Sequence, residues 1–222
     1  RDFCLSRGLG DVYKRQDHKR ALCDEDMKKV FTRLPSSSAI PLAVRRAQDM
    51  FVLMFLLRGL PFVDLAYLRK SDLRDNVITY RRRKTGRPLS VTLTPEALEL
   101  LKKYMNRDSH SPYLFSLLKS GEGTKEAYRE YQLALRSFNQ QLTLLGEVLG
   151  LNDKLSSYTA RHTWATTAYY CEIHPGIISE AMGHSSIKVT ETYLKPFRNK
   201  KIDEANNQII DFVKHSIAGV VA

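Results

Sequence analysis

Cysteine is scarce in this sequence, and long apolar runs are absent. The 222 residues include only three cysteines, Cys4, Cys23 and Cys171, which are scattered and form no CxxC pair. This usage argues against a disulfide scaffold or structural zinc, and it favours the reducing cytoplasm. The longest apolar run, Met50 to Leu57, stops at Arg58. A membrane span needs ~18 apolar residues, so the sequence predicts none, and no secretory signal is visible.

Acidic residues are outnumbered by basic ones. The chain carries 35 Lys and Arg against 24 Asp and Glu, a formal net charge of +11. Such an excess indicates a polyanionic partner, most simply nucleic acid. The hydrophobic content of 43% and charged content of 27% are ordinary for a globular protein, which excludes wholesale disorder, collagen and a long coiled coil. The length suits one well-cored domain.

Residues 1–16 do not share the patterning of the rest of the chain. The run RDFCLSRGLGDVYKRQ has neither helical nor strand periodicity. Its GLGDVYKRQ portion resembles the translated sequencing-adapter tails at the ends of assembled environmental gene fragments. We therefore expect this segment to be non-native, with the domain spanning 17–222 and the true N-terminal part of the gene product missing.

From residue 19 onward the pattern is mostly helical. Amphipathic or apolar stretches predict helices at 24–34, 40–57, 61–69, 95–105, 125–150, 160–171, 175–182, 187–193 and 200–218. Alternating β-branched residues at 76–83 and 88–93, separated by Thr85-Gly86, predict a β-hairpin, and 113–115 a further short strand. The expected fold class is mainly α (α+β), a single domain with a small antiparallel sheet.

One segment, 155–197, carries three residue blocks at characteristic intervals. Arg161, the pair Gly183-His184 and Tyr193 follow one another with spacings of 23 and 9 residues from arginine to histidine to tyrosine. The blocks resemble those of the DNA breaking-rejoining catalytic domain of tyrosine recombinases (the phage integrase family), particularly integrases of Bacteroidetes-type mobile elements. The resemblance extends through GLPFVDLAYLRKSDL at 59–73 and YRRRKTGRPLSV at 80–91, and covers roughly 20–215.

The resemblance implies a site-specific recombinase that cleaves and rejoins DNA through a 3′-phosphotyrosyl intermediate, without metal, ATP or another cofactor. Tyr193 would be the nucleophile. Arg161 would place its planar guanidinium on two phosphate oxygens, and His184 would donate a hydrogen bond to the same phosphate. Lys84, near the hairpin tip, would protonate the 5′-oxygen leaving group as general acid. Double-stranded DNA is the implied partner, and the family works as tetramers on two DNA sites.

Two positions depart from the family pattern. Tyr158 stands where the family has a His or Lys, three residues before the arginine. A phenol with a pKa of roughly 10 is a poor base near pH 7, so His162 and His174 are alternative bases, although His162 directly follows Arg161 and is expected to point elsewhere.

The second departure is Pro61, which occupies the place of the family's first catalytic arginine. Arg82 is our first choice as a replacement and Arg58 the second. Because alternate residues of a strand share a face, a hairpin that aims Lys84 at DNA would aim Arg82 there too.

Further basic residues are candidate contacts to the DNA backbone, which would make affinity salt-dependent and carry no sequence information. They are Arg45, Arg46, Arg69, Lys70, Arg81, Arg83 and Arg87. The apolar stripe of the last helix either packs on its own domain or docks on a neighbouring protomer. Two other functions remain open: a non-catalytic DNA-binding relative, and a type IB topoisomerase-like enzyme.

Overall fold

A computed structural model describes residues 21–32, 34, 40–194, 197 and 199–218. The expected non-native segment 1–16 lies outside these residues. Within them, no helix is both long and apolar enough to cross a membrane.

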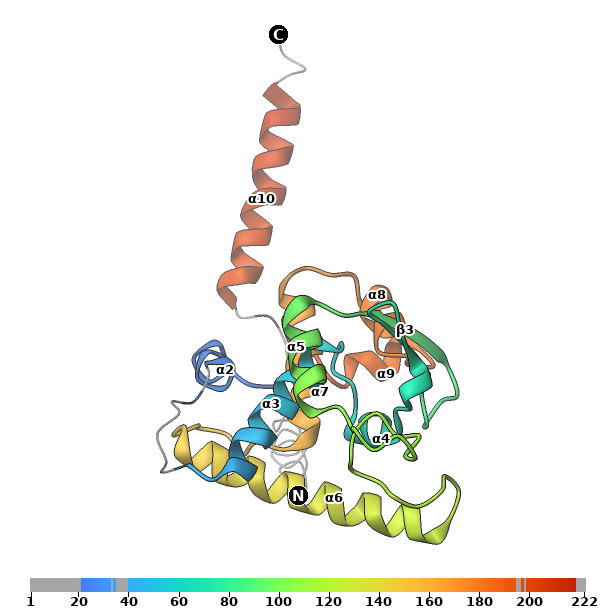
Figure 1. Cartoon of the computed structure of the whole chain (residues 1–222). Coiled ribbons are helices and arrows are strands. Elements are labelled where there is room, and N and C mark those ends of the chain that lie inside the picture. Colours follow the sequence, from blue (N-terminus) through green and yellow to red (C-terminus); the bar gives the residue numbers. More distant parts are fainter. Residues whose placement is uncertain (1–20, 33, 35–39, 195–196, 198, 219–222) are drawn as a thin grey trace, which may run out of the picture.

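The helices form where the hydrophobic periodicity predicts them, and α3 lies at the centre of the molecule (Figure 1). Seven of its fifteen residues are buried, because α3 packs against α2, α5, α6 and α7. The elements are α2 (Asp24–Phe31), α3 (Leu42–Leu56), α4 (Phe62–Tyr67), α5 (Pro95–Tyr104), α6 (Lys125–Val148), α7 (Ser157–Tyr170), α8 (Pro175–Ala181), α9 (Ile187–Glu191) and α10 (Asn199–Ala218).

The sheet is the predicted hairpin extended by one short strand. Strands β1 (Leu73–Arg74), β2 (Val77–Arg81) and β3 (Pro88–Thr92) pair antiparallel in that order. Ile78 pairs with Val91, and both are buried, so one face of the hairpin joins the core. The strand expected at 113–115 is reduced to two isolated bridges, from Arg69 to Tyr113 and from Met105 to Phe115. Strand β1 and the 3₁₀ turn η1 (Lys70–Asp72) were not predicted, because two or three residues carry no readable period.

The apolar interior has two parts. The large core is built around α3 and includes fully buried residues such as Phe51, Leu53 and Leu65. A smaller cluster joins Ala165 of α7 to Ile178 and Met182 at α8, and Tyr193 packs against it. This second cluster fixes the segment that carries Tyr193 against α7.

Helix α10 extends away from the rest of the molecule (Figure 1). Its apolar residues Ile202, Ile209 and Val213 are 55%, 64% and 48% exposed. Its first turn contacts the domain through an ion pair of 2.5 Å between Lys201 and Glu172. Of the two arrangements left open for this helix, packing on its own domain is not seen for these three residues.

Candidate active site

Arg161 lies in α7, with its guanidinium buried against two backbone carbonyls. Nη1 donates to the carbonyl oxygen of Gly59 at 2.9 Å, and Nη2 donates to that of Met182 at 2.7 Å. The residue is 2% exposed, and its Nε has no hydrogen-bond partner among the described residues. Burial, and then the charge of Arg82, lowers the pKa of Arg161 to about 10, so the side chain stays charged at neutral pH. A buried guanidinium with an unused donor is suited to an anion.

Two glycines permit this close packing. Gly59 follows α3 with φ +67°, and a Cβ there would lie 2.9 Å from the Cα of Arg161. Gly183 follows α8 with φ +64°, and a Cβ there would lie 2.9 Å from the Cγ of Arg82. Non-bonded carbons prefer about 3.5–4.0 Å. Any other residue at either position would therefore push a site arginine away.

His184 lies in the turn between α8 and α9, hydrogen-bonded through both ring nitrogens. Nε2 lies 2.8 Å from Nη2 of Arg161, and Nδ1 lies 2.8 Å from Oγ1 of Thr190. Because a guanidinium can only donate, Nε2 must accept, and the neutral ring must carry its proton on Nδ1 and donate it to Thr190. Burial, and then the charge of Arg161, lowers the pKa of His184 to about 3, so the imidazole is neutral at pH 7.

The ring of Tyr193 covers these two side chains. Its centroid lies 5.1 Å from that of His184, and the guanidinium carbon of Arg161 lies 5.6 Å from it. The backbone carbonyl of Tyr193 accepts a hydrogen bond of 3.0 Å from the hydroxyl of Thr166. The structure thus brings together the three residues of the predicted blocks.

The expectation that His162 points elsewhere is wrong. Its ring centroid lies 4.5 Å from that of Tyr193. Successive helical residues are about 100° apart around the axis, so one large ring lying across α7 contacts both Arg161 and His162.

Arg82 is buried beside Arg161, with 5% of its surface exposed. Its Nη1 donates at 3.3 Å to the carbonyl of Met182, the same oxygen that binds Arg161. Its Nε pairs at 3.1 Å with Oδ2 of Asp64 in α4. Burial raises the pKa of the Asp64 carboxyl, and the charge of Arg82 partly offsets the shift. Asp64 therefore compensates one of two adjacent guanidinium charges, and the pocket remains positive.

The predicted reason for placing Arg82 beside Lys84 is wrong, although both lie near the site. Strand β2 ends at Arg81 and residues 83–85 form a turn, so no strand alternation relates the two side chains. Arg82 is buried whereas Lys84 is exposed. Lys84 lies near the site, since its charge is among those that lower the pKa of His184.

Arg58 is less well placed than Arg82. It ends α3 in the left-handed conformation, with φ +59°, and is half-buried. Burial raises the pKa of the neighbouring Tyr80, and the charge of Arg58 is among those that oppose the shift. It thus lies beside the site, next to Tyr80.

The two other candidates occupy different surroundings. Tyr158 lies one turn before Arg161 in α7, is 51% exposed, and lines a small cavity of about 50 Å³ together with Pro61 and Arg161. His174 caps α8, where its Nδ1 accepts the backbone N–H of Gly176 at 3.0 Å, and it is exposed. Tyr158 therefore lies near the arginine, and His174 has a capping role.

The seven basic residues expected to contact the DNA backbone all interact with other groups of the chain. Arg69 and Arg83 pair with Glu122, Lys70 donates to the carbonyl of Asp108, Arg81 to that of Gly86, Arg87 to that of Ser185 and Arg45 to that of Ile40, while Arg46 lies over the ring of Tyr104. Five of them are exposed, namely Arg46, Arg69, Arg81, Arg83 and Arg87, whereas Arg45 and Lys70 are half-buried.

The roles of two residues near the site were not predicted from the sequence. Thr190 is the hydrogen-bond partner of His184 Nδ1, and its signal in the sequence is its position six residues after that histidine. Glu122 joins two arginines from a loop of the chain, and its only signal is the sequence Gly-Glu-Gly. Among the described residues, no group of three His, Cys, Asp or Glu side chains is arranged to hold a metal ion.

Comparison with known proteins agrees with this geometry. Residues 19–200 match the model of the Phage integrase family. The chain is 26% identical over 180 residues to "Tyrosine recombinase XerA" of Pyrococcus furiosus, covering 79% of this chain and 57% of that protein. It is 27% identical over 184 residues to "Tyrosine recombinase" of Pseudothermotoga lettingae, covering 78% of this chain and 59% of the relative. The chain thus spans little more than half the length of these curated relatives.

Solved structures share the fold. The crystal structure of XerA recombinase superposes with a TM-score of 0.58 at 20% identity, covering 85% of this chain and 64% of that one. The Tn1549 transposon integrase, solved in complex with transposon right end DNA, gives a TM-score of 0.61 at 16% identity, covering 94% and 71%.

Proposed function

The chain belongs to the phage integrase family, and from that membership and the site geometry we propose that it is a site-specific tyrosine recombinase acting on double-stranded DNA. The observation that carries the proposal is the contact of Tyr193 with Arg161 and His184, at a site where Arg82 adds a second buried positive charge. A phosphodiester is the anion that such a site and a nearby phenol would process.

In the proposed step, Oη of Tyr193 attacks the scissile phosphorus. A tyrosine–phosphate bond forms, the bond between phosphorus and the 5′-oxygen breaks, and a 5′-hydroxyl leaves. Because one phosphoester replaces another, the energy of the bond is retained and ATP is not needed. Attack by the hydroxyl of a partner strand reverses the step and completes the exchange.

Arg161 and Arg82 together would stabilise the charge of the transition state. The unused Nε–H of Arg161 is a buried donor, and both guanidinium groups converge on the carbonyl of Met182. This convergence is why we propose Arg82, ahead of Arg58, as the replacement for the arginine that Pro61 displaces. His184 would complete the set by donating from Nε2. This requires the ring proton to move from Nδ1 to Nε2, so that the Thr190 hydroxyl donates to Nδ1 and the phosphate replaces Arg161 as the partner of Nε2.

Protons must be removed from the tyrosine and given to the leaving group. We propose His162 as the acceptor, since its ring contacts that of Tyr193, with Tyr158 as a hydrogen-bonding partner of phosphate. Lys84 would give its proton to the 5′-oxygen.

The kind of mobile genetic element to which the recombinase belongs is part of the same proposal. We propose an integrase of a Bacteroidetes-type mobile element, because Pro61 replaces an arginine that some such integrases also lack. Residues 17–222 would form its catalytic domain, acting as a tetramer on two DNA sites in the bacterial cytoplasm. The exposed apolar stripe of α10 supports contact between copies.

The test is covalent trapping on nicked suicide duplexes with a randomised core, scored as protein–DNA adducts on denaturing gels. Wild type is expected to form an adduct and Tyr193→Phe none, while Tyr169→Phe, from the same apolar cluster, forms it normally. Arg82→Lys keeps the positive charge opposite Asp64 but loses the planar, bidentate guanidinium. It is expected to lower the adduct yield at least about tenfold, more than Arg58→Ala does.

Each rival function gives a different result. A non-catalytic relative would give no adduct with any variant. A topoisomerase-like enzyme would give the adduct and relax supercoiled DNA, without joining strands from two duplexes. Equal yields from Tyr193→Phe and wild type would contradict the assignment of the nucleophile.

A further inference from the structure

The turn that carries Lys84 is held by two separate sets of contacts. In the first set, the hydroxyl of Thr85 donates to the carbonyl of Gly183 at 3.1 Å, and Arg87 donates to the carbonyl of Ser185 at 3.4 Å. These bonds tie the turn to the segment that contains His184. In the second set the anchor is Arg83, the residue directly before Lys84.

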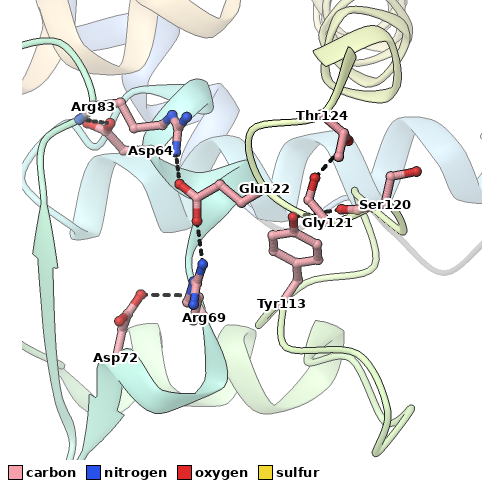
Figure 2. A network of polar contacts seen from close by, with 9 residues as sticks. All are labelled: Asp64, Arg69, Asp72, Arg83, Tyr113, Ser120, Gly121, Glu122 and Thr124. Atoms are coloured by element: carbon pink, nitrogen blue, oxygen red, sulfur yellow. Dashed lines mark hydrogen bonds and ion pairs between the residues drawn. The ribbon is translucent and has the colours of Figure 1, made fainter. Parts of the chain in front are cut away.

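Arg83 is fixed by three groups that lie outside the hairpin. Its backbone N–H donates to Oδ1 of Asp64 at 2.9 Å. Its guanidinium carbon lies 3.7 Å from the centre of the Tyr67 ring, and Nη1 lies 2.5 Å from Oε1 of Glu122. Figure 2 shows Glu122 placed between Arg83 and Arg69, with one carboxylate oxygen directed to each. Both arginines lower the pKa of the Glu122 carboxyl through their hydrogen bonds, Arg69 first.

The loop that carries Glu122 is itself well anchored. The backbone N–H groups of Lys119 and Ser120 donate to Oε2 of Glu130 in α6, at 2.7 and 3.1 Å. The Tyr113 hydroxyl donates to the carbonyl of Ser120 at 2.8 Å, and that of Thr124 donates to the carbonyl of Gly121 at 2.7 Å (Figure 2). Glu122 therefore connects the hairpin turn to a loop that is itself anchored to α6.

An isolated surface ion pair adds little to stability, typically 0–1 kcal/mol. A carboxylate on an anchored loop, paired with an arginine that also stacks on Tyr67, is better suited to determining position than to stabilising the fold. A proton donor depends on position, since a misplacement of about 1 Å can cost about a hundredfold in rate.

We propose that Glu122 is a positioning residue, which acts through Arg83 to hold Lys84 where it can protonate the 5′-oxygen leaving group. This inference rests on the proposed function, because it requires DNA cleavage and the assignment of Lys84 as general acid. It assigns a role to a residue outside the blocks that identify the family.

The variants compared are Glu122→Gln and Arg83→Gln, with two controls. Arg69→Gln removes the other partner of Glu122 but leaves the pair with Arg83. Glu126→Gln removes the same charge from an exposed position in the first turn of α6. All four positions are at least partly exposed, so we expect these proteins to fold.

The first measurement is amide hydrogen exchange across 82–87, where the N–H of Gly86 donates to the carbonyl of Arg82. Glu122→Gln and Arg83→Gln are expected to exchange about fivefold faster there than wild type, and both controls at the wild-type rate. Unchanged exchange in Glu122→Gln would overturn the proposal whether or not the protein cleaves DNA.

The second measurement is the cleavage rate on two versions of a duplex selected by trapping, one natural and one with sulfur in place of the 5′-oxygen. A thiol has a pKa of about 8.5 and leaves without a donated proton. On the oxygen substrate, Lys84→Ala is expected to be at least about 100-fold slower and Glu122→Gln about tenfold slower. On the sulfur substrate both are expected to match wild type.

The outcomes separate the two proposals. Slow cleavage by Glu122→Gln that sulfur does not restore would overturn the positioning role while leaving the recombinase assignment intact. If wild type forms no adduct, the proposed function fails, and with it the role of Lys84 that Glu122 would serve. Binding to a fluorescein-labelled random duplex gives a further distinction: Glu122→Gln should bind no more weakly than wild type, because it frees two arginines, whereas misfolding would weaken binding.

Discussion

At the level of single residues, the site is defined by buried positive charge with incomplete compensation. Arg161 and Arg82 share one carbonyl oxygen, and Asp64 pairs with only one of them. His184 adapts to this environment by staying neutral, since a third charge there would be repelled by both guanidinium groups. A bound phosphate would relieve that repulsion.

The neutral state of His184 makes folding stability pH-dependent. Its pKa is about 3 in the folded chain, against about 6.5 when unfolded, so between these values only the unfolded state binds the proton. Stability is therefore expected to rise with pH through this window and to be fully present above about pH 6.5. We expect a loss on the order of 1 kcal/mol between pH 7 and pH 5.

The measurement is urea denaturation at both pH values for wild type and His184→Gln. The glutamine variant cannot take up this proton and should lose correspondingly less stability on acidification. Equal losses in both proteins would show that His184 does not carry the effect.

At the level of elements, the site depends on close approach between backbones. The turn after α3 packs on α7 at Gly59, and the hairpin packs on the turn after α8 at Gly183. Both contacts require a left-handed glycine without a Cβ. The packing of these elements places the carbonyls of Gly59 and Met182 around Arg161.

Three glycine-to-alanine changes separate backbone strain from steric conflict. Gly150→Ala is the control, since Gly150 has φ +58° with nothing within 4 Å of an added Cβ, and should cost about 1 kcal/mol. Gly183→Ala should cost somewhat more, because the flexible side chain of Arg82 can move away. Gly59→Ala should cost the most, at least about 3 kcal/mol, because its added Cβ meets the Cα of Arg161.

Chemical denaturation of the three variants measures this order. A Gly59→Ala protein as stable as Gly150→Ala would mean that α3 and α7 can separate without cost, which contradicts the packing seen here.

At the level of the whole molecule, α10 is the one described helix that projects from the body (Figure 1). Its apolar stripe is exposed, so its substitution should leave folding unchanged and alter association between copies. Ile209→Asp and Val213→Asp are each expected to change the free energy of unfolding, measured by thermal denaturation, by no more than about 0.5 kcal/mol. On DNA, they are expected to reduce the mass of the assembly in sedimentation, whereas Asn207→Asp on the same helix leaves it unchanged.

A clear loss of thermal stability in the two aspartate variants would instead show that the stripe packs on its own domain in solution. Equal assembly of all variants on DNA would remove α10 from the contact between copies.

The sequence alone determined the helices, the hairpin and the three residue blocks of the candidate site. Apolar periodicity is a local property, so α3, α5, α6 and β2–β3 lie close to where it placed them. The spacing of Arg161, His184 and Tyr193 is also visible along the chain, and the structure brings these side chains into contact. The family could therefore be predicted before any fold was known.

Tertiary structure alone decided which other groups join the site. Arg82 and Lys84 differ in burial because β2 ends at Arg81, and His162 contacts Tyr193 because the ring of Tyr193 lies across two residues of α7. Glu122 meets Arg83 across 39 positions of the chain, through a loop that has no period to read. Contacts of this kind arise from packing between distant segments, and neither residue type nor local spacing predicts which segments will pack together.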